Sequence, residues 1–204
     1  MSAPLRVGVL LSGTGTNLQA ILDGAPGSGY EVVVAVSDKA QALGLERARG
    51  AGVAAVHVDP KAYDDRQAFN EALADVLRDH RVELVCLAGF MRILAPNFIK
   101  AFEGRIINIH PALLPAFPGA HAVRDALEWG ARVTGSTVHF ADEEVDHGPI
   151  LLQEAVPILP GDDEGTLHDR IKGVEHRLYP EAIRLIAAGR VRIDGRRVTI
   201  TPEG

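Results

Sequence analysis

Runs of valine, isoleucine and other apolar residues alternate with stretches of helical periodicity through the first half of the chain. Short β-branched runs are typical of buried strands, whereas apolar residues that recur at helical spacing are typical of amphipathic helices. The predicted strands cover residues 7–11, 32–36, 53–58, 84–88 and 106–109. The predicted helices lie near residues 18–22, 42–49, 66–78 and 96–102. This alternation predicts a parallel sheet with right-handed crossovers.

The second half of the chain has a different pattern. Residues 137–140 and 150–158 are predicted to form a strand pair, joined by an acidic loop at 141–148. A long helix is expected from about residue 166 to residue 188, and the alternating residues at 191–200 predict a terminal hairpin. The predicted fold class is therefore α/β: a Rossmann-like, mostly parallel sheet with helices on both faces, extended by antiparallel strands in the C-terminal half.

Composition places the chain among cytoplasmic globular proteins. Its 204 residues, 47% of them hydrophobic, suffice for one buried core, so a single domain over residues 1–204 is expected. The lone cysteine, Cys86, lies in an apolar run and is expected in the core, which suits a reducing compartment. The apolar run at 7–11 is too short for a signal peptide or a membrane helix.

The net charge of −6 argues against nucleic acid or an anionic membrane surface as a partner. We therefore expect small-molecule substrates. If these are anionic, their charges must be met locally, by helix N-termini and a few Arg or Lys side chains. The composition leaves monomer and dimer open.

The most informative polar residues follow the fifth predicted strand. Asn108 and His110 are two positions apart, so on a strand their side chains lie on the same face. Pro111 cannot donate to a sheet ladder, which places both side chains at the carboxyl end of the strand, where open α/β sheets bind ligands. An amide, an imidazole and the carboxylate of Asp146 could together stabilise an oxyanion and move a proton. The three residues favour a catalytic site over a merely hydrogen-bonded strand end.

The first strand and the first helix are joined by a glycine-rich turn, Ser12-Gly13-Thr14-Gly15-Thr16-Asn17. Glycines allow close approach of a ligand, and the N–H groups of a helix start favour phosphate. The turn lacks the third glycine of a dinucleotide fingerprint and the Gly-Lys-Ser/Thr of a triphosphate loop. A phosphate site and a plain turn capped by Thr16 or Asn17 fit it equally well. Asp38, near the end of the second strand, keeps a dinucleotide-binding module open as an alternative.

A metal site is the least favoured interpretation of the acidic loop. Six donor groups crowd there, namely His139, Asp142, Glu143, Glu144, Asp146 and His147. None of them shows the His-x-x-x-His or Cys-x-x-Cys spacing of a closed zinc site, and a solvated acidic loop explains most of them. We therefore expect no metal.

The segment after the fourth strand, residues 87–94, is apolar and contains Gly89. It could form the wall of a pocket for a flat aromatic ligand, with backbone groups hydrogen-bonding the edge of the heterocycle. Taken alone, a turn that simply packs on the core is the stronger interpretation.

Four motifs, in this order along the chain, resemble the folate-dependent formyltransferase family. They are Ser-Gly-x-Gly-x-Asn at 12–17, Ala-Gly-Phe-Met-Arg-Ile-Leu at 88–94, Asn-Ile-His-Pro-x-Leu-Leu-Pro at 108–115 and Asp-x-Gly-Pro-Ile at 146–150. The resemblance runs from about residue 5 to residue 179. The first motif and Lys172-Gly173-Val174-Glu175-His176 are similar to the phosphoribosylglycinamide formyltransferase branch, which serves purine biosynthesis.

The resemblance implies a role for each motif. The substrate phosphate would bind backbone N–H groups of Gly15, Thr16 and Asn17. The same nucleotide would contact Lys172, Gly173, Val174 and Glu175, with Glu175 accepting hydrogen bonds from ribose hydroxyls. The implied folate site comprises Arg66, Met91, Arg92, Ile93, Leu94, Asn108, Asp142, Glu143, Glu144, Val145 and Asp146. In that site Arg66 would contact the anionic tail, and residues 91–94 would face residues 142–146 across the pterin.

The implied reaction uses 10-formyltetrahydrofolate as formyl donor and needs no metal. Protonated His110 and the Asn108 amide would donate to the oxygen of a tetrahedral intermediate, each such donor being typically worth ~3–4 kcal/mol. Asp146 would keep His110 oriented and charged, because a nearby carboxylate raises a histidine pKa. A formyltetrahydrofolate hydrolase would keep the same three residues, but its water acceptor needs no phosphate loop. A dinucleotide-binding module would leave Asn108 and His110 unexplained.

Overall fold

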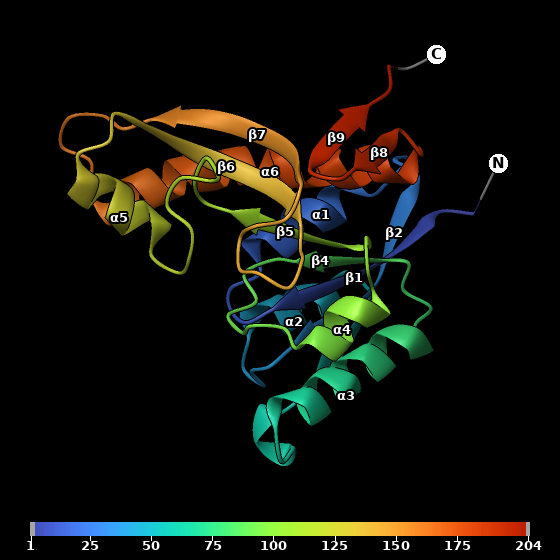
Figure 1. Ribbon diagram of the computed structural model, residues 1–204. Helices are drawn as coiled ribbons and strands as arrows, with labels where there is room; N and C mark the ends of the chain where they lie inside the picture. Colours follow the sequence, from blue (N-terminus) through green and yellow to red (C-terminus); the bar gives the residue numbers. More distant parts are fainter. Residues whose placement is uncertain (1–2, 203–204) are drawn as a thin grey trace. The chain divides into compact units, whose positions relative to one another are not determined.

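The computed structural model describes residues 3–202 and divides into two compact units, Met1–Ile107 and Asn108–Gly204. Figure 1 colours the chain from its N-terminus to its C-terminus. The expectation that the whole chain forms a single domain stays a prediction. In the described residues, no helix is long and apolar enough to cross a membrane.

Parallel strands form the centre of the first unit (Figure 1). β1 (Leu5–Leu11) pairs in parallel with β2 (Tyr30–Ser37) and with β4 (Leu84–Leu87), and β2 pairs in parallel with β3 (Ala54–His57). β5 (Ile106–His110) begins in this unit, next to β4, and continues into the second. β1 is apolar on both faces, as expected for a strand covered by helices on each side of a parallel sheet.

Four α-helices and one short 3₁₀ helix connect these strands. The α-helices are α1 (Thr16–Gly24), α2 (Leu43–Gly50), α3 (Arg66–Asp79) and α4 (Pro96–Ala101), and the 3₁₀ helix covers Pro60–Ala62. α3 is fixed by its N-cap, because the Asp65 carboxylate accepts a hydrogen bond from Ala68 N at 2.8 Å. It buries Phe69, Leu73 and Leu77 on one face, at the spacing that predicted the helix.

The second unit is built on antiparallel strands and one long helix. β6 (Val133–Phe140) and β7 (Ile150–Pro157) pair in antiparallel fashion, and β6 follows β5 in the sheet order. α6 (Glu164–Ala187) packs on both strands and on α5 (Ala122–Trp129). The buried cluster beneath it consists of Val123, Val156, Leu167, Ile171 and Val174. The chain ends in the hairpin of β8 (Val191–Asp194) and β9 (Arg197–Ile200), with β9 beside β7.

The predicted fold class is confirmed, and so are the predicted strands, the long helix and the terminal hairpin. The prediction missed α5 and the 3₁₀ helix, and it began β6 four residues late. α5 is amphipathic and buries Ala122, Val123 and Ala126, but with only eight residues its pattern is too short to stand out in the sequence. Neither Thr16 nor Asn17 caps α1: the N-cap is Gly15, with a positive φ of 71° and no side-chain cap.

Candidate active site

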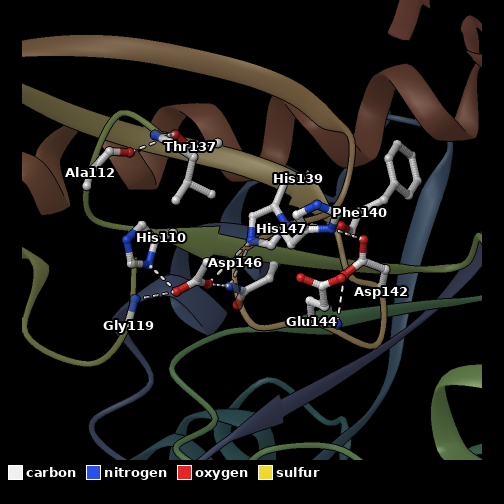
Figure 2. Close-up of polar contacts among 12 residues, drawn as sticks. His110, Ala112, Gly119, Thr137, His139, Phe140, Asp142, Glu144, Asp146 and His147 are labelled. Carbon is white, nitrogen blue, oxygen red and sulfur yellow. Dashed lines mark hydrogen bonds and ion pairs between the residues drawn. The ribbon is translucent and has the colours of Figure 1, made fainter. Parts of the chain in front are cut away.

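β5 and the loop between β6 and β7 bring the three predicted catalytic residues together, and Figure 2 labels two of them, His110 and Asp146. Asn108 Nδ2 lies 3.4 Å from Asp146 Oδ1, and His110 Nδ1 lies 3.3 Å from Asp146 Oδ2. The strand alternation of Asn108 and His110 therefore does direct both side chains toward one carboxylate. The His110 and Asp146 side chains are almost fully buried, at 5% and 8% exposed, so their charges interact with little screening by water.

Backbone geometry holds the Asp146 carboxylate at this point. Asp146 itself has a left-handed backbone, with φ of 54°, which a short polar side chain tolerates better than most. Its Oδ2 atom also accepts a hydrogen bond from Gly119 N at 2.7 Å (Figure 2). The Asp146 carboxylate thus links the loop that follows β6 to the loop that follows β5, which contains Gly119.

His139, which lies on the predicted strand at 137–140 and was considered only among the donor groups near the acidic loop, is a further member of this cluster. It is buried on β6, and its Nε2 atom lies 3.1 Å from Asn108 Nδ2 and 3.7 Å from Asp146 Oδ1. Its Nδ1 atom faces the Phe140 carbonyl at 3.0 Å, an acceptor that calls for a hydrogen on Nδ1. The available signal was strand alternation, because His139 shares a face of β6 with Thr137.

Thr137 fixes the chain just after β5. Its hydroxyl donates to the Ala112 carbonyl at 2.6 Å and accepts from Leu114 N at 3.1 Å, and Gln153 Nε2 donates to the same oxygen at 2.9 Å. A buried hydroxyl with all of these partners satisfied is a rigid anchor. It therefore sets the position of the segment that follows His110.

Both ring nitrogens of His110 face oxygen acceptors. Nδ1 faces Asp146, and Nε2 lies 2.8 Å from the Phe117 carbonyl, where it can only be a donor. Burial lowers the pKa of His110 below its ordinary value, although the Asp146 charge and the Phe117 carbonyl both act to raise it. Asp146 thus acts on the pKa of His110 in the predicted direction, but burial outweighs it, an effect that the prediction left out.

Asp146 stays ionised in this setting. Burial acts to raise its pKa, but the hydrogen bonds from His139 and from Gly119 N, with the charges of His110 and His139, lower the pKa below its ordinary value. The site therefore contains a fixed negative charge beside an imidazole whose positive form is disfavoured by burial. A ring of this kind is suited to exchanging a proton during a reaction.

The rest of the acidic loop lies toward solvent. Val145 is 56% exposed, and the Asp142 carboxylate accepts from Glu144 N at 3.0 Å and from His147 Nδ1 at 2.8 Å (Figure 2). At the loop exit, a Cβ on Gly148 would fall 1.8 Å from the Phe140 carbonyl oxygen, so glycine is required there by close packing. Within residues 3–202, no group of three His, Cys, Asp or Glu side chains is placed to hold a metal ion.

In the first unit, the glycine-rich turn and residues 87–94 lie against each other, because Met91 N donates to Ser12 Oγ at 2.9 Å. Arg47, which the sequence analysis did not single out, donates from Nε to the Thr14 carbonyl at 2.9 Å and brings a cation to the turn. Met91 and Ile93 are 70% and 60% exposed. Exposed apolar side chains favour a ligand wall at this segment over a turn that only packs on the core.

Two further residues of the first unit that the sequence pointed to are Asp38, which forms an ion pair, and Arg66, which lines a surface hollow. The Asp38 carboxylate pairs with Arg92 Nε at 2.7 Å, and the Arg92 guanidinium lies 5.6 Å above the Phe69 ring. Asp38 is thus committed to a cation, which weakens the dinucleotide alternative. Arg66 lines a surface hollow of about 350 Å³, together with Asp65, Gln67, Ala95, Pro96 and Asn97.

The four predicted nucleotide residues of α6 belong to the second unit. Glu175 is 5% exposed, and Lys172 Nζ pairs with Asp169 at 3.1 Å. The Val174 side chain is part of the apolar cluster under α6, so Val174 could contact a ligand only through its backbone atoms. These residues belong to the second unit, whereas the glycine-rich turn belongs to the first.

Residues 5–183 match the formyl transferase family, and the chain belongs to this family. It is 47% identical over 199 residues to the phosphoribosylglycinamide formyltransferase of Mycobacterium tuberculosis, covering 98% of this chain and 93% of that protein. It is 51% identical over 191 residues to the trifunctional purine biosynthetic protein adenosine-3 of Gallus gallus, covering 93% of this chain but only 19% of that much longer protein.

Solved structures show the same likeness. Glycinamide ribonucleotide transformylase 1 from Symbiobacterium toebii is 56% identical with a TM-score of 0.97, covering 99% of this chain and 96% of that chain. Phosphoribosylglycinamide formyltransferase from Anaplasma phagocytophilum is 40% identical with a TM-score of 0.91, covering 98% and 95% of the two chains.

Proposed function

We propose that this protein transfers the formyl group of 10-formyltetrahydrofolate to the amine of 5-phosphoribosyl-glycinamide, a step of de novo purine biosynthesis. The observation that carries the proposal is a single buried carboxylate, Asp146, in contact with both Asn108 and His110. Family membership and the names of the full-length relatives support the same reaction.

The reaction forms one C–N bond and breaks another. The substrate amine attacks the formyl carbon, and the electron pair of the C=O bond moves to the oxygen. When the tetrahedral species collapses, the bond from carbon to folate N10 breaks, so the amine loses a proton and N10 gains one. The Asn108 amide, which lies 3.4 Å from Asp146 Oδ1 in the free protein, would donate to the developing oxyanion instead, a contact that strengthens as the charge forms.

His110 would accept and return the proton. Burial keeps the ring easy to deprotonate, while the Asp146 charge favours the imidazolium when a proton arrives. Its Nε2–H is donated to the Phe117 carbonyl, so a substrate oxygen would have to take the place of that carbonyl to receive the hydrogen bond. Asp146 would then remain on Nδ1 and fix the orientation of the ring.

The substrate-binding assignments are part of the proposal. Gly15, Thr16 and Asn17 at the start of α1 would offer backbone N–H groups to the phosphate, with Arg47 adding a positive charge beside the turn. Lys172, Gly173, Val174 and Glu175 would contact the same nucleotide. Exposed residues of the segment at 91–94 and of the loop at 142–146 would border the folate, and Arg66 would meet its anionic tail.

An absorbance assay of the folate product, run with and without glycinamide ribonucleotide, tests the proposed reaction. We expect product only when the nucleotide is present, because the amine is the formyl acceptor. Equal product without the nucleotide would contradict the proposal and select a hydrolase, whose acceptor is water. A variant lacking the hydrogen-bond donor, Asn108→Ala, is the control: its rate should fall by about 10²-fold or more.

A further inference from the structure

The turn of the terminal hairpin contacts the loop that carries Asp146. Arg196 Nη2 donates to the His147 carbonyl at 2.6 Å, and Arg196 Nη1 lies 3.0 Å from His147 Nε2. The two residues are 49 positions apart in the sequence. A guanidinium that binds a backbone carbonyl and the side chain of the same residue fixes that residue in two directions.

His147 relays this contact across the loop. Its Nδ1 atom lies 2.8 Å from Asp142 Oδ2, which requires a hydrogen on Nδ1, whereas the contact with Arg196 requires a lone pair on Nε2. One tautomer of the ring therefore satisfies both partners. The contact between Asp142 and His147 ties the start of the loop to its end, and Asp142 also accepts from Glu144 N at 3.0 Å.

The middle of the loop needs such support because packing does little to set its conformation. Its residues 143–145 are exposed, and Asp146 next to His147 has the left-handed backbone that local interactions must hold. Inside the site, Asp146 is held by Gly119 N and by its two catalytic neighbours. Arg196 is the anchor on the solvent side, one residue away from the carboxylate.

The terminal hairpin contributes little to the core and can serve mainly to hold Arg196 against the loop. Its strands have four residues each, and every side chain from Arg192 to Arg197 is exposed. It is tied to the end of α6 by Thr201 N donating to the Arg190 carbonyl at 2.9 Å, and β9 lies beside β7. It therefore presents Arg196 from a fixed base without adding much to the core.

We propose that Arg196 is a positioning residue, which holds the loop at 141–148 through His147 so that Asp146 meets Asn108 and His110. The effect on the rate rests on the proposed function, since it acts through Asp146, but the effect on the loop does not. Removing Arg196 frees the solvent side of the loop and lowers the fraction of molecules in which the carboxylate is in place.

The test compares Arg196→Ala with Arg197→Ala. Arg197 is the next residue of the hairpin, is equally exposed, and makes no ion pair or side-chain hydrogen bond within the described part of the chain. Hydrogen exchange of the free protein should be about fivefold faster at residues 141–148 in Arg196→Ala and unchanged in Arg197→Ala. Arg196→Lys keeps the charge but cannot bind in two directions, so its exchange should lie between the two.

Steady-state kinetics supply the second readout. For Arg196→Ala, kcat/KM for the folate should fall about tenfold while the KM for the nucleotide stays within about twofold, and melting temperatures should agree within ~2 °C. Unchanged exchange in Arg196→Ala overturns the proposal, and so does faster exchange with unchanged kinetics. If the wild-type chain shows no formyl transfer, the proposed function fails, while the exchange experiment still decides whether Arg196 holds the loop.

Discussion

His110 shows how burial and a neighbouring charge compete at one residue. The Asp146 carboxylate at 3.3 Å favours the imidazolium, but burial of the ring disfavours it and prevails, so the pKa is lowered. The sequence reveals the acid and the base but not how deeply the fold will bury them. The residue pair was therefore predictable, whereas the sign of the pKa shift was not.

A lowered histidine pKa makes the protein less stable in acid. Between the folded-state pKa and the ordinary value of 6.5, the unfolded chain binds more protons, so the free energy of unfolding falls as the pH falls through this window. Urea unfolding from about pH 5 to about pH 8 should show this slope, and His110→Gln should make it shallower. His168 and His176 also have lowered pKa values, so part of the slope should remain.

Asp146→Asn provides the matched comparison for this titration. It removes a charge that acts to raise the pKa of His110 in the folded protein, so the window in which acid destabilises should widen toward lower pH. An identical slope in wild type and His110→Gln would show that His110 does not titrate as its burial requires.

At the scale of elements, Gly15 at the start of α1 must be glycine for two reasons, its backbone conformation and its contact with α2. Gly15 has a φ of 71°, and a Cβ there would lie 2.5 Å from the Cα atom of Gly44 at the start of α2. The α1–α2 contact therefore requires glycine whether or not a phosphate binds. Packing and ligand approach favour the same residue here, so the sequence could not separate them.

Gly15→Ala should consequently destabilise the fold by about 1–3 kcal/mol, because both the backbone strain and the clash with backbone atoms must be relieved. Gly13→Ala is the control, since no atom lies within 4 Å of a Cβ at that position and its φ is not positive. Chemical denaturation of both variants measures the difference. Equal stability of the two would mean that α1 and α2 can separate at little cost.

At the scale of the whole molecule, the sequence predicted the architecture well because strand–helix alternation is a strong signal. It also grouped Asn108 and His110 at one strand end, through strand alternation and Pro111, and it added Asp146 from a loop motif; the structure brings the three side chains together. It did not reveal the Gly119 amide or the Phe117 carbonyl, because backbone groups carry no residue signature. Arg196 was missed for a related reason: an arginine in a hairpin turn is ordinarily solvated.

The central claim is that the charge of Asp146, shared between Asn108 and His110, carries the formyl transfer. Asp146→Asn keeps the shape of the side chain and can still accept from Gly119 N, so the fold should persist. We expect kcat to fall by about 10² or more with little change in either KM, because oxyanion stabilisation acts mainly in the transition state.

The measurement is kcat of Asp146→Asn at saturating nucleotide and folate, with single-turnover rates to show that product release is not limiting. A folded variant whose kcat drops by about two orders of magnitude agrees with the account. A folded variant that keeps more than about a tenth of the wild-type kcat contradicts it, and Asp146 would then serve only to anchor its loop.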